Sequence, residues 1–148
     1  MADLEFFIKA SVSGSGKDRE GIIFADDQEI RYSVPASMGG KGVGASPETL
    51  LLSAVTACYS LTLLAYLQKR RLPCSDVEVK TEGVVTGFPQ HDTYAKIIVN
   101  PVVNGGDSSR QTEYRDAARE AREHCFIGQT VAAGGVAYEL GSVTVPSS

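Results

Sequence analysis

A long uncharged run, from Leu50 to Leu67, most constrains how this 148-residue chain can fold. The run is just long enough to suggest a membrane span. However, serine, threonine and tyrosine residues are scattered along it, and strand-like segments flank it on both sides. A helix that is apolar all round can equally be the central helix of a protein core. We therefore expect a core helix and no membrane contact.

The residues at the two ends of this run support a helix. Ser46 suits the N-cap, Pro47 suits the first helical position, and Glu48 places an acid in the first turn. A basic cluster at residues 68–71 lies at the other end, where cations favour the negative end of the helix dipole. These signals predict a helix that ends at about Lys69.

The rest of the chain alternates between strand-like and helical patterns. We expect strands at 4–12, 21–25, 29–34, 76–80, 94–99 and 137–145, a second helix at about 111–124, and a helical turn at 129–133. No internal repeat or linker interrupts this order. The pattern predicts one α+β domain over residues 1–148, with antiparallel sheets wrapped around long central helices.

Charge and cysteine content narrow the function. A net charge of −4 gives no basic surface for nucleic acid. The N-terminus carries acids where a secretory signal needs basic residues, so we expect a cytoplasmic protein whose three cysteines stay reduced. The two histidines and three cysteines lack zinc spacing, and the glycine-rich loop at 39–44 lacks nucleotide-binding spacing. We expect neither a metal nor a cofactor.

Two cysteines stand out by position. Cys58 lies in the middle of the uncharged run, and Cys125 follows the second predicted helix on its apolar stripe. Burial alone makes a thiol inert, because an apolar environment disfavours the thiolate. Cys58 is therefore either an ordinary core cysteine or a thiol activated by a group from elsewhere in the structure. We expect Cys74, at a turn, to be incidental, and His124 to contact helix-end carbonyls.

The segment that begins Ser46-Pro-Glu and ends Ala-Cys58 resembles the Asn-Pro-Glu…Ala-x-Cys signature of the OsmC/Ohr family, the organic hydroperoxide reductases and osmotically inducible proteins. Cys125, after Arg-Glu-His, matches the family's second cysteine in place and spacing. The Arg19-Glu-Gly segment and the predicted hairpin after it also follow the family layout. The resemblance covers nearly the whole chain.

The resemblance implies a thiol peroxidase that reduces alkyl or fatty-acid hydroperoxides to alcohols. Cys58 would be the peroxidatic thiol, and Cys125 would condense with its sulfenic acid to form a disulfide. An external dithiol, for example a lipoyl group carried by a protein, would reduce that disulfide. By matching position, Arg19 and Glu48 would activate Cys58, with Lys17 as the rival of Arg19.

Helix geometry constrains this activation. A continuous helix separates Glu48 from Cys58 by about 15 Å, at 1.5 Å per residue. The two residues therefore cannot share a site within one unbroken helix. Either the helix breaks, or a partner chain delivers Glu48, together with Arg19. We favour the second alternative, which predicts an intertwined homodimer.

The chain departs from the family pattern in two places. Ser46 replaces the usual Asn, which conserves capping. After Cys125 the chain has Phe126-Ile127-Gly128, where the family usually has Pro followed by Ser or Asn. This second departure supports another hypothesis, a catalytically weakened stress-response or apolar-ligand-binding module. A third is a redox sensor that uses the same two thiols without turnover.

Overall fold

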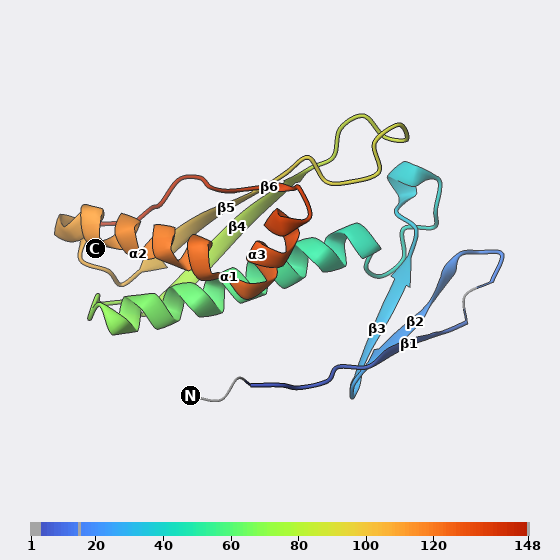
Figure 1. Ribbon diagram of the computed structural model, residues 1–148, viewed down its shortest axis with the longest axis horizontal. Coiled ribbons are helices and arrows are strands. Elements are labelled where there is room, and N and C mark those ends of the chain that lie inside the picture. Colours follow the sequence, from blue (N-terminus) through green and yellow to red (C-terminus); the bar gives the residue numbers. More distant parts are fainter. Residues whose placement is uncertain (1–3, 15, 148) are drawn as a thin grey trace. The chain divides into compact units, whose positions relative to one another are not determined.

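The computed structural model describes residues 4–14 and 16–147, and its internal contacts divide the chain into two units, with the boundary in the sequence between Leu51 and Leu52. The first unit contains a three-stranded antiparallel sheet in the order β1-β2-β3 (Figure 1). The second unit contains most of the long helix, a second three-stranded sheet and two further helices. The single domain over residues 1–148 stays a prediction.

The predicted hairpin is confirmed in the first unit. Strand β2 (Glu20–Ala25) and strand β3 (Gln28–Ser33) pair along their whole length and turn at Asp26, whose φ of 50° an aspartate tolerates better than most residues. Strand β1 (Ala10–Ser13) is shorter than the predicted strand at 4–12, because its pairing with β2 begins only at Ala10. A single 3-10 turn, η1 (Ala36–Met38), follows the hairpin.

Helix α1 (Pro47–Lys69) forms as its end signals predict. The Ser46 Oγ accepts a hydrogen bond from the Thr49 N–H at 3.1 Å, which confirms the N-cap. At the other end Arg71 adopts a left-handed conformation with φ 56°, and the Leu72 N–H donates to the Leu67 carbonyl at 2.9 Å. These bonds satisfy backbone groups that a helix end otherwise leaves unpaired.

The sheet of the second unit is mixed rather than wholly antiparallel. Strands β4 (Asp76–Val84) and β5 (Lys96–Asn104) pair antiparallel, as predicted, whereas β6 (Ala137–Leu140) joins β5 in parallel. Two helices lie between β5 and β6 in the chain, and such a connection can return it to the same end of the sheet. Strand β6 is also shorter than the predicted strand at 137–145.

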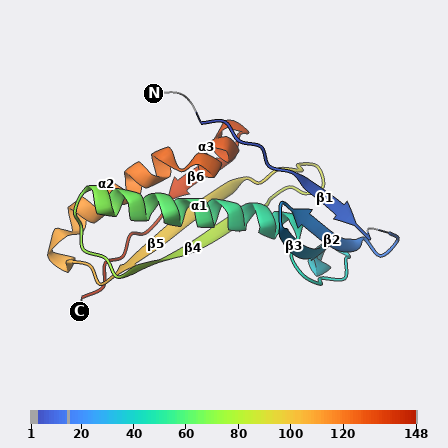
Figure 2. The ribbon, with the colours of Figure 1, turned by 90° about the horizontal axis from the view of Figure 1, so that it is seen from below.

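The two helices of this connection follow a short turn, η2 (Ser108–Arg110). Helix α2 (Gln111–His124) has the bounds that the sequence predicts. Helix α3 (Phe126–Ala133) follows α2 (Figure 2). It is longer than the turn expected at 129–133 and begins directly after Cys125. Cys125 is therefore the single residue between two helices.

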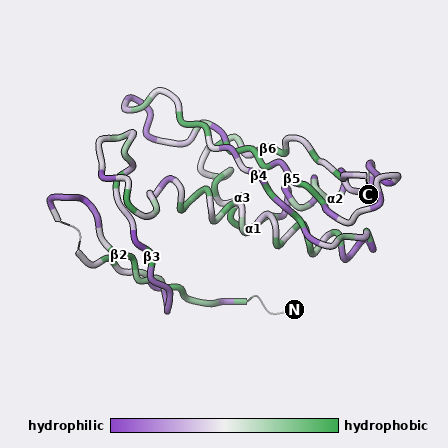
Figure 3. The backbone as a smooth tube through the Cα atoms, turned by 180° about the vertical axis from the view of Figure 1, so that it is seen from behind, coloured by the Kyte–Doolittle hydropathy of each residue, from purple (hydrophilic) through white to green (hydrophobic). Residues whose placement is uncertain are grey.

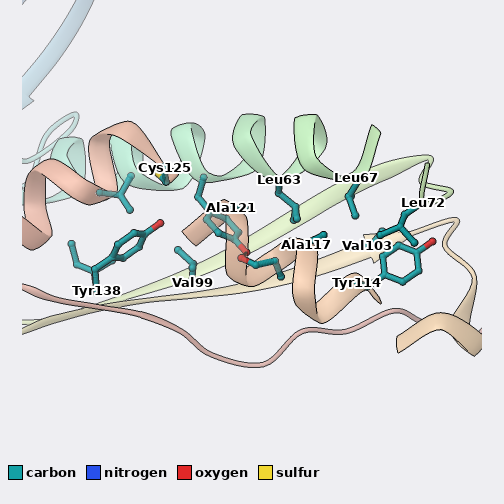
Figure 4. Packing of buried hydrophobic residues seen from close by; sticks show 14 of the residues in the cluster. Leu63, Leu67, Leu72, Val99, Val103, Tyr114, Ala117, Ala121, Cys125 and Tyr138 are labelled. Atoms are coloured by element: carbon teal, nitrogen blue, oxygen red, sulfur yellow. Dashed lines mark hydrogen bonds between the residues drawn. The ribbon is translucent and has the colours of Figure 1, made fainter. Parts of the chain in front are cut away.

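The core of the second unit lies between α1, α2 and β5 (Figure 4). Leu63 and Leu67 of α1 point toward Ala117 of α2 and Val103 of β5 in that view. Each element contributes residues at its own period, every fourth residue on α1 and every second on β5. The buried side chains of these elements are Val55, Tyr59, Leu63, Leu67, Ile97, Val99, Pro101, Val103, Tyr114, Ala117, Ala118 and Ala121.

Helix α1 is buried on one face only. Its other face is also apolar and carries Ala54, Ala57, Leu61 and Leu64, all exposed, with Leu61 69% and Leu64 39% accessible. Green, hydrophobic stretches recur along α1 (Figure 3). By length and composition alone α1 could cross a membrane. The stripe that packs into the core is instead typical of a helix that covers a sheet.

Candidate active site

Cys58 lies near the middle of α1 and is half-buried. Its side chain packs against the core of the second unit, and its carbonyl accepts a hydrogen bond from the Thr62 Oγ1 at 2.8 Å. Ala54 and Leu61, one turn away on either side, are exposed. Cys58 therefore has a side chain at the edge of the core, next to the exposed apolar face of α1.

Cys125 is fully buried, with an accessibility of 0%. It occupies the N-cap position of α3, where its carbonyl accepts the Gln129 N–H at 2.8 Å. Its extended backbone, with φ −69° and ψ 112°, ends α2 and starts α3. This position brings the Cys125 sulfur to the N-terminal end of α3, where backbone N–H groups are unpaired.

The two thiols interact with each other. Both are free, and Cys58 lies near enough to raise the pKa of the Cys125 thiol. Cys58 comes from α1, while Cys125 comes from the junction of α2 and α3, far along the chain. The structure therefore brings together the two thiols that the sequence singled out, and their chemical roles stay predictions.

Burial dominates the acidity of Cys125. It raises the pKa of this thiol above the ordinary value, and the Cys58 thiol raises it further. The Tyr138 hydroxyl and the Gly128 backbone N–H act in the opposite direction, because both favour the thiolate and so lower the pKa of Cys125. The net result is a Cys125 thiol that is protonated at neutral pH, with two donors beside its sulfur.

Sequence analysis missed Tyr138 and Gly128 as parts of this site. Tyr138, on β6, is 2% exposed, and burial raises the pKa of its phenol, which therefore stays neutral. The Arg122 guanidinium lies 5.3 Å from its ring centroid and donates to its carbonyl, with Nε at 2.9 Å. The one available signal was Gly128, which lies in the segment that departs from the family pattern.

The predicted activators lie in the first unit. Arg19 has a left-handed backbone with φ 54°, and its Nη2 donates to the Gly39 carbonyl at 3.4 Å. Lys17, its rival, is exposed. Glu48 occupies the first turn of α1, and this helix continues unbroken past Cys58. Of the two alternatives for Glu48, a broken helix is therefore wrong, and the activating role of Arg19 and Glu48 stays a prediction.

Other polar side chains do not gather into a metal centre in the described part of the chain, where no three His, Cys, Asp or Glu residues could hold an ion. His124 stacks on the ring of Tyr66, with centroids 5.8 Å apart. Burial, with a smaller effect from Asp76, raises the pKa of the Cys74 thiol. Neither residue adds a group to the site of Cys58 and Cys125.

Comparison with known proteins gives one family. The family model described as OsmC-like protein matches residues 39–140. The chain is also similar to a protein of Bacillus subtilis (strain 168) named Uncharacterized protein YmaD. The two are 32% identical over 134 residues, which cover 88% of this chain and 89% of the relative.

Solved structures with a similar fold include proteins from three bacteria. The organic hydroperoxide resistance protein OsmC of Legionella pneumophila superposes with a TM-score of 0.79 and 20% identity, covering 97% of this chain and 100% of that one. An OsmC-like protein of Mycoplasma pneumoniae gives 0.77 and 17%, covering 99% and 100%. The organic hydroperoxide resistance protein OhrB of Bacillus subtilis gives 0.66 and 22%, covering 94% and 98%. At these identities the likeness establishes a shared fold.

Proposed function

This chain belongs to the OsmC-like protein family, and on that basis we propose that it reduces organic hydroperoxides to alcohols with the Cys58 thiol. The observation that carries the proposal is the meeting of two free thiols from distant parts of the chain, one half-buried and one fully buried. Two of the solved structures with the same fold are named organic hydroperoxide resistance proteins, which supports the same activity.

The unequal burial of the thiols supports different roles for them. Cys58 is the thiol that a peroxide can reach, so its thiolate attacks the distal oxygen and the O–O bond breaks. The alkoxide leaves, takes a proton and becomes the alcohol, while Cys58 is oxidised to a sulfenic acid. The Cys125 thiolate then attacks the Cys58 sulfur, the S–O bond breaks, and water leaves after one proton is added.

The same burial directs the return step. Cys125 is fully buried, so an external dithiol cannot reach it. The thiolate of the dithiol therefore attacks the Cys58 sulfur. The S–S bond breaks, Cys125 leaves with the electron pair, and the second thiol of the reductant displaces Cys58 from the mixed disulfide. These two steps require two thiols in one reductant, so a dithiol suits them better than a monothiol. A lipoyl group carried by a protein is one such reductant. We place this reaction in the cytoplasm, where the thiols of proteins are kept reduced.

The surroundings of Cys58 favour apolar substrates. The Cys58 side chain itself packs against the apolar core of the second unit. An alkyl or fatty-acid hydroperoxide buries apolar surface there, with a gain of roughly 25 cal/mol per Å². Hydrogen peroxide has no apolar part that could gain in this way. We therefore expect organic hydroperoxides to react faster than hydrogen peroxide.

The proposed enzyme is a homodimer. The exposed apolar face of α1, with Ala54, Ala57, Leu61 and Leu64, needs cover from water. Glu48 is about 15 Å from Cys58 along an unbroken helix, so it cannot serve the Cys58 of its own α1. A homodimer meets both requirements if the partner delivers Arg19 and Glu48 to Cys58. Arg19 would then stabilise the thiolate, and Glu48 would orient the guanidinium.

The segment after Cys125 does not favour a weakened, non-catalytic module. Phe126-Ile127-Gly128 begins a regular helix, and Gly128 supplies an N–H that favours the Cys125 thiolate. A segment that had lost its chemical role would have no reason to keep such a donor at the sulfur. The departure from the family pattern is better explained as a different way of holding the second thiol.

Peroxide consumption tests the proposal directly. We expect the purified protein to consume cumene hydroperoxide with dithiothreitol or dihydrolipoamide, Cys58→Ser to abolish turnover, and Cys125→Ser to allow one oxidation and then stall. Cys74→Ser is the matched control and should keep full activity. Mass spectrometry after one equivalent of peroxide should find a peptide that links Cys58 to Cys125. Turnover by Cys58→Ser, or a linkage through Cys74, would overturn the proposal.

A further inference from the structure

The Tyr138 hydroxyl is a buried polar group that the mechanism above does not use. Its oxygen is inaccessible to water and makes no hydrogen bond of ordinary geometry to any of the described residues while both thiols are reduced. A buried hydroxyl without a partner is unfavourable by about 1–3 kcal/mol, so its retention needs a reason. This hydroxyl acts on the Cys125 thiol, whose thiolate form it favours.

The ring of Tyr138 is held in this place from two sides. The Arg122 guanidinium of α2 covers one region of the ring and donates to the Tyr138 carbonyl, with its centre 5.3 Å from the ring centroid. Gly128 of α3 leaves the space that the ring occupies, because a Cβ there would lie 2.2 Å from the Tyr138 Cε2. In Figure 4 the hydroxyl points toward Cys125. The ring is therefore fixed with its donor directed at the sulfur.

Other buried tyrosines of this core have a partner. The Tyr59 hydroxyl donates to the Ala118 carbonyl at 3.0 Å, and the Tyr114 hydroxyl donates to the Pro73 carbonyl at 2.6 Å. Tyr138 differs from both, because its hydroxyl is directed at a group that gains full acceptor strength only as an anion. A neutral thiol is a weak acceptor, whereas a thiolate accepts a strong, charge-assisted hydrogen bond.

We propose that the Tyr138 hydroxyl is the hydrogen-bond donor that stabilises the Cys125 thiolate whenever the chemistry produces it. Its role in turnover rests on the proposed function. The thiolate is produced twice: before Cys125 attacks the Cys58 sulfenic acid, and again when Cys125 leaves as the disulfide is reduced. Tyr138 keeps its proton in both steps, and the Gly128 N–H is the second donor to the same sulfur.

The test isolates Cys125 so that it does not depend on peroxidase activity. In a Cys58→Ser/Cys74→Ser background, Cys125 is the sole thiol, and the thiolate absorbance at 240 nm follows its titration. Adding Tyr138→Phe should raise the pKa of Cys125 by about one pH unit or more, because a hydrogen bond to an ionised group is roughly twice as strong as a neutral one. Tyr114→Phe, which removes a hydroxyl from the same core, should leave this pKa unchanged.

Reduction of the disulfide gives a second readout. The Cys58–Cys125 disulfide can be formed with diamide in otherwise unaltered protein, and its reduction by dithiothreitol should be about tenfold slower or more in Tyr138→Phe. Oxidation of Cys58 by cumene hydroperoxide should keep its rate. If Tyr138→Phe fails to fold, 3-fluorotyrosine placed at position 138 decides instead, since this stronger donor should lower the pKa of Cys125.

The possible outcomes separate the two proposals. An unchanged Cys125 pKa in Tyr138→Phe, or in the fluorinated variant if that one is used, overturns the role of Tyr138 even if the enzyme is an active peroxidase. A raised pKa in Tyr138→Phe, in a protein that consumes no hydroperoxide, overturns the peroxidase proposal and leaves Tyr138 as the donor to Cys125. An equal change in Tyr114→Phe would mean a general loosening of the core and would also overturn the role of Tyr138.

Discussion

Gly128 lies directly against the ring of Tyr138, and a Cβ at position 128 would be 2.2 Å from Cε2, 2.6 Å from Cζ and 2.9 Å from the hydroxyl oxygen of that ring. These distances are far shorter than van der Waals contact. The Tyr138 ring thus occupies the space that a side chain at position 128 would need. Through this relationship a glycine on α3 determines how closely a phenol on β6 approaches Cys125.

Gly128→Ala should destabilise the protein although alanine is the better helix former. The gain in helix propensity is up to about 1 kcal/mol, whereas forcing an extra methyl group into a packed core costs roughly 1–3 kcal/mol. Urea denaturation should therefore find a lower free energy of unfolding. Gly16→Ala, where nothing lies within 4 Å of the new Cβ, is the control and should change little. Equal stability of Gly128→Ala and wild type would refute the contact.

The rate of disulfide formation should depend on pH through Cys125. Burial raises the pKa of this thiol above its ordinary value, so below that pKa only a small fraction is thiolate. The rate at which Cys125 resolves the Cys58 sulfenic acid should then rise about tenfold per pH unit from pH 7 to 9, because one proton is lost. Stopped-flow mixing with one equivalent of hydroperoxide measures this step. A rate that is constant over this range would contradict a protonated Cys125.

Leu61→Glu should dissociate the proposed homodimer. Leu61 is 69% exposed on the apolar face of α1, so a charge there leaves the fold of one chain intact but cannot be buried against a second copy. Light scattering coupled to gel filtration should give the mass of a single chain, and turnover should fall if, as proposed, the partner delivers Arg19 and Glu48. Thr112→Glu adds the same charge to an exposed position of α2 and should stay dimeric. A dimeric Leu61→Glu protein would exclude this face as the interface.

Glu120→Gln should remove part of the sensitivity to acid. The Arg70 guanidinium at the end of α1 pairs with Glu120 of α2 and lowers the pKa of that carboxyl. A lowered pKa stabilises the folded state above the unfolded value, and this contribution is lost as the pH falls through the folded value. Thermal unfolding between pH 6 and 2 should depend less steeply on pH in Glu120→Gln. Glu123→Gln, on the same helix, is the control, and an equal effect there would exclude a specific role for the pair.

Some features of this fold were predictable because they depend on neighbours in sequence. The Ser46 cap, the bounds of α1 and α2, and the hairpin at Asp26 follow from capping residues, helical period and turn chemistry. Family membership was predictable because the Pro-Glu…Ala-Cys element and the second cysteine carry it in sequence. Cys58 and Cys125 were singled out for the same reason.

Other features depend on contacts between residues far apart in the chain. Strand β6 pairs parallel to β5 because two helices lead the chain back, and no local pattern specifies that direction. Phe126-Ile127-Gly128 looked like a departure from a pattern, and only packing against β6 revealed what the glycine accommodates. The sequence by itself singled out the two thiols that the structure brings together and predicted the helix that carries the first of them. The tertiary structure alone decided what surrounds the second sulfur, because its burial and its donors come from residues that meet only when the core closes.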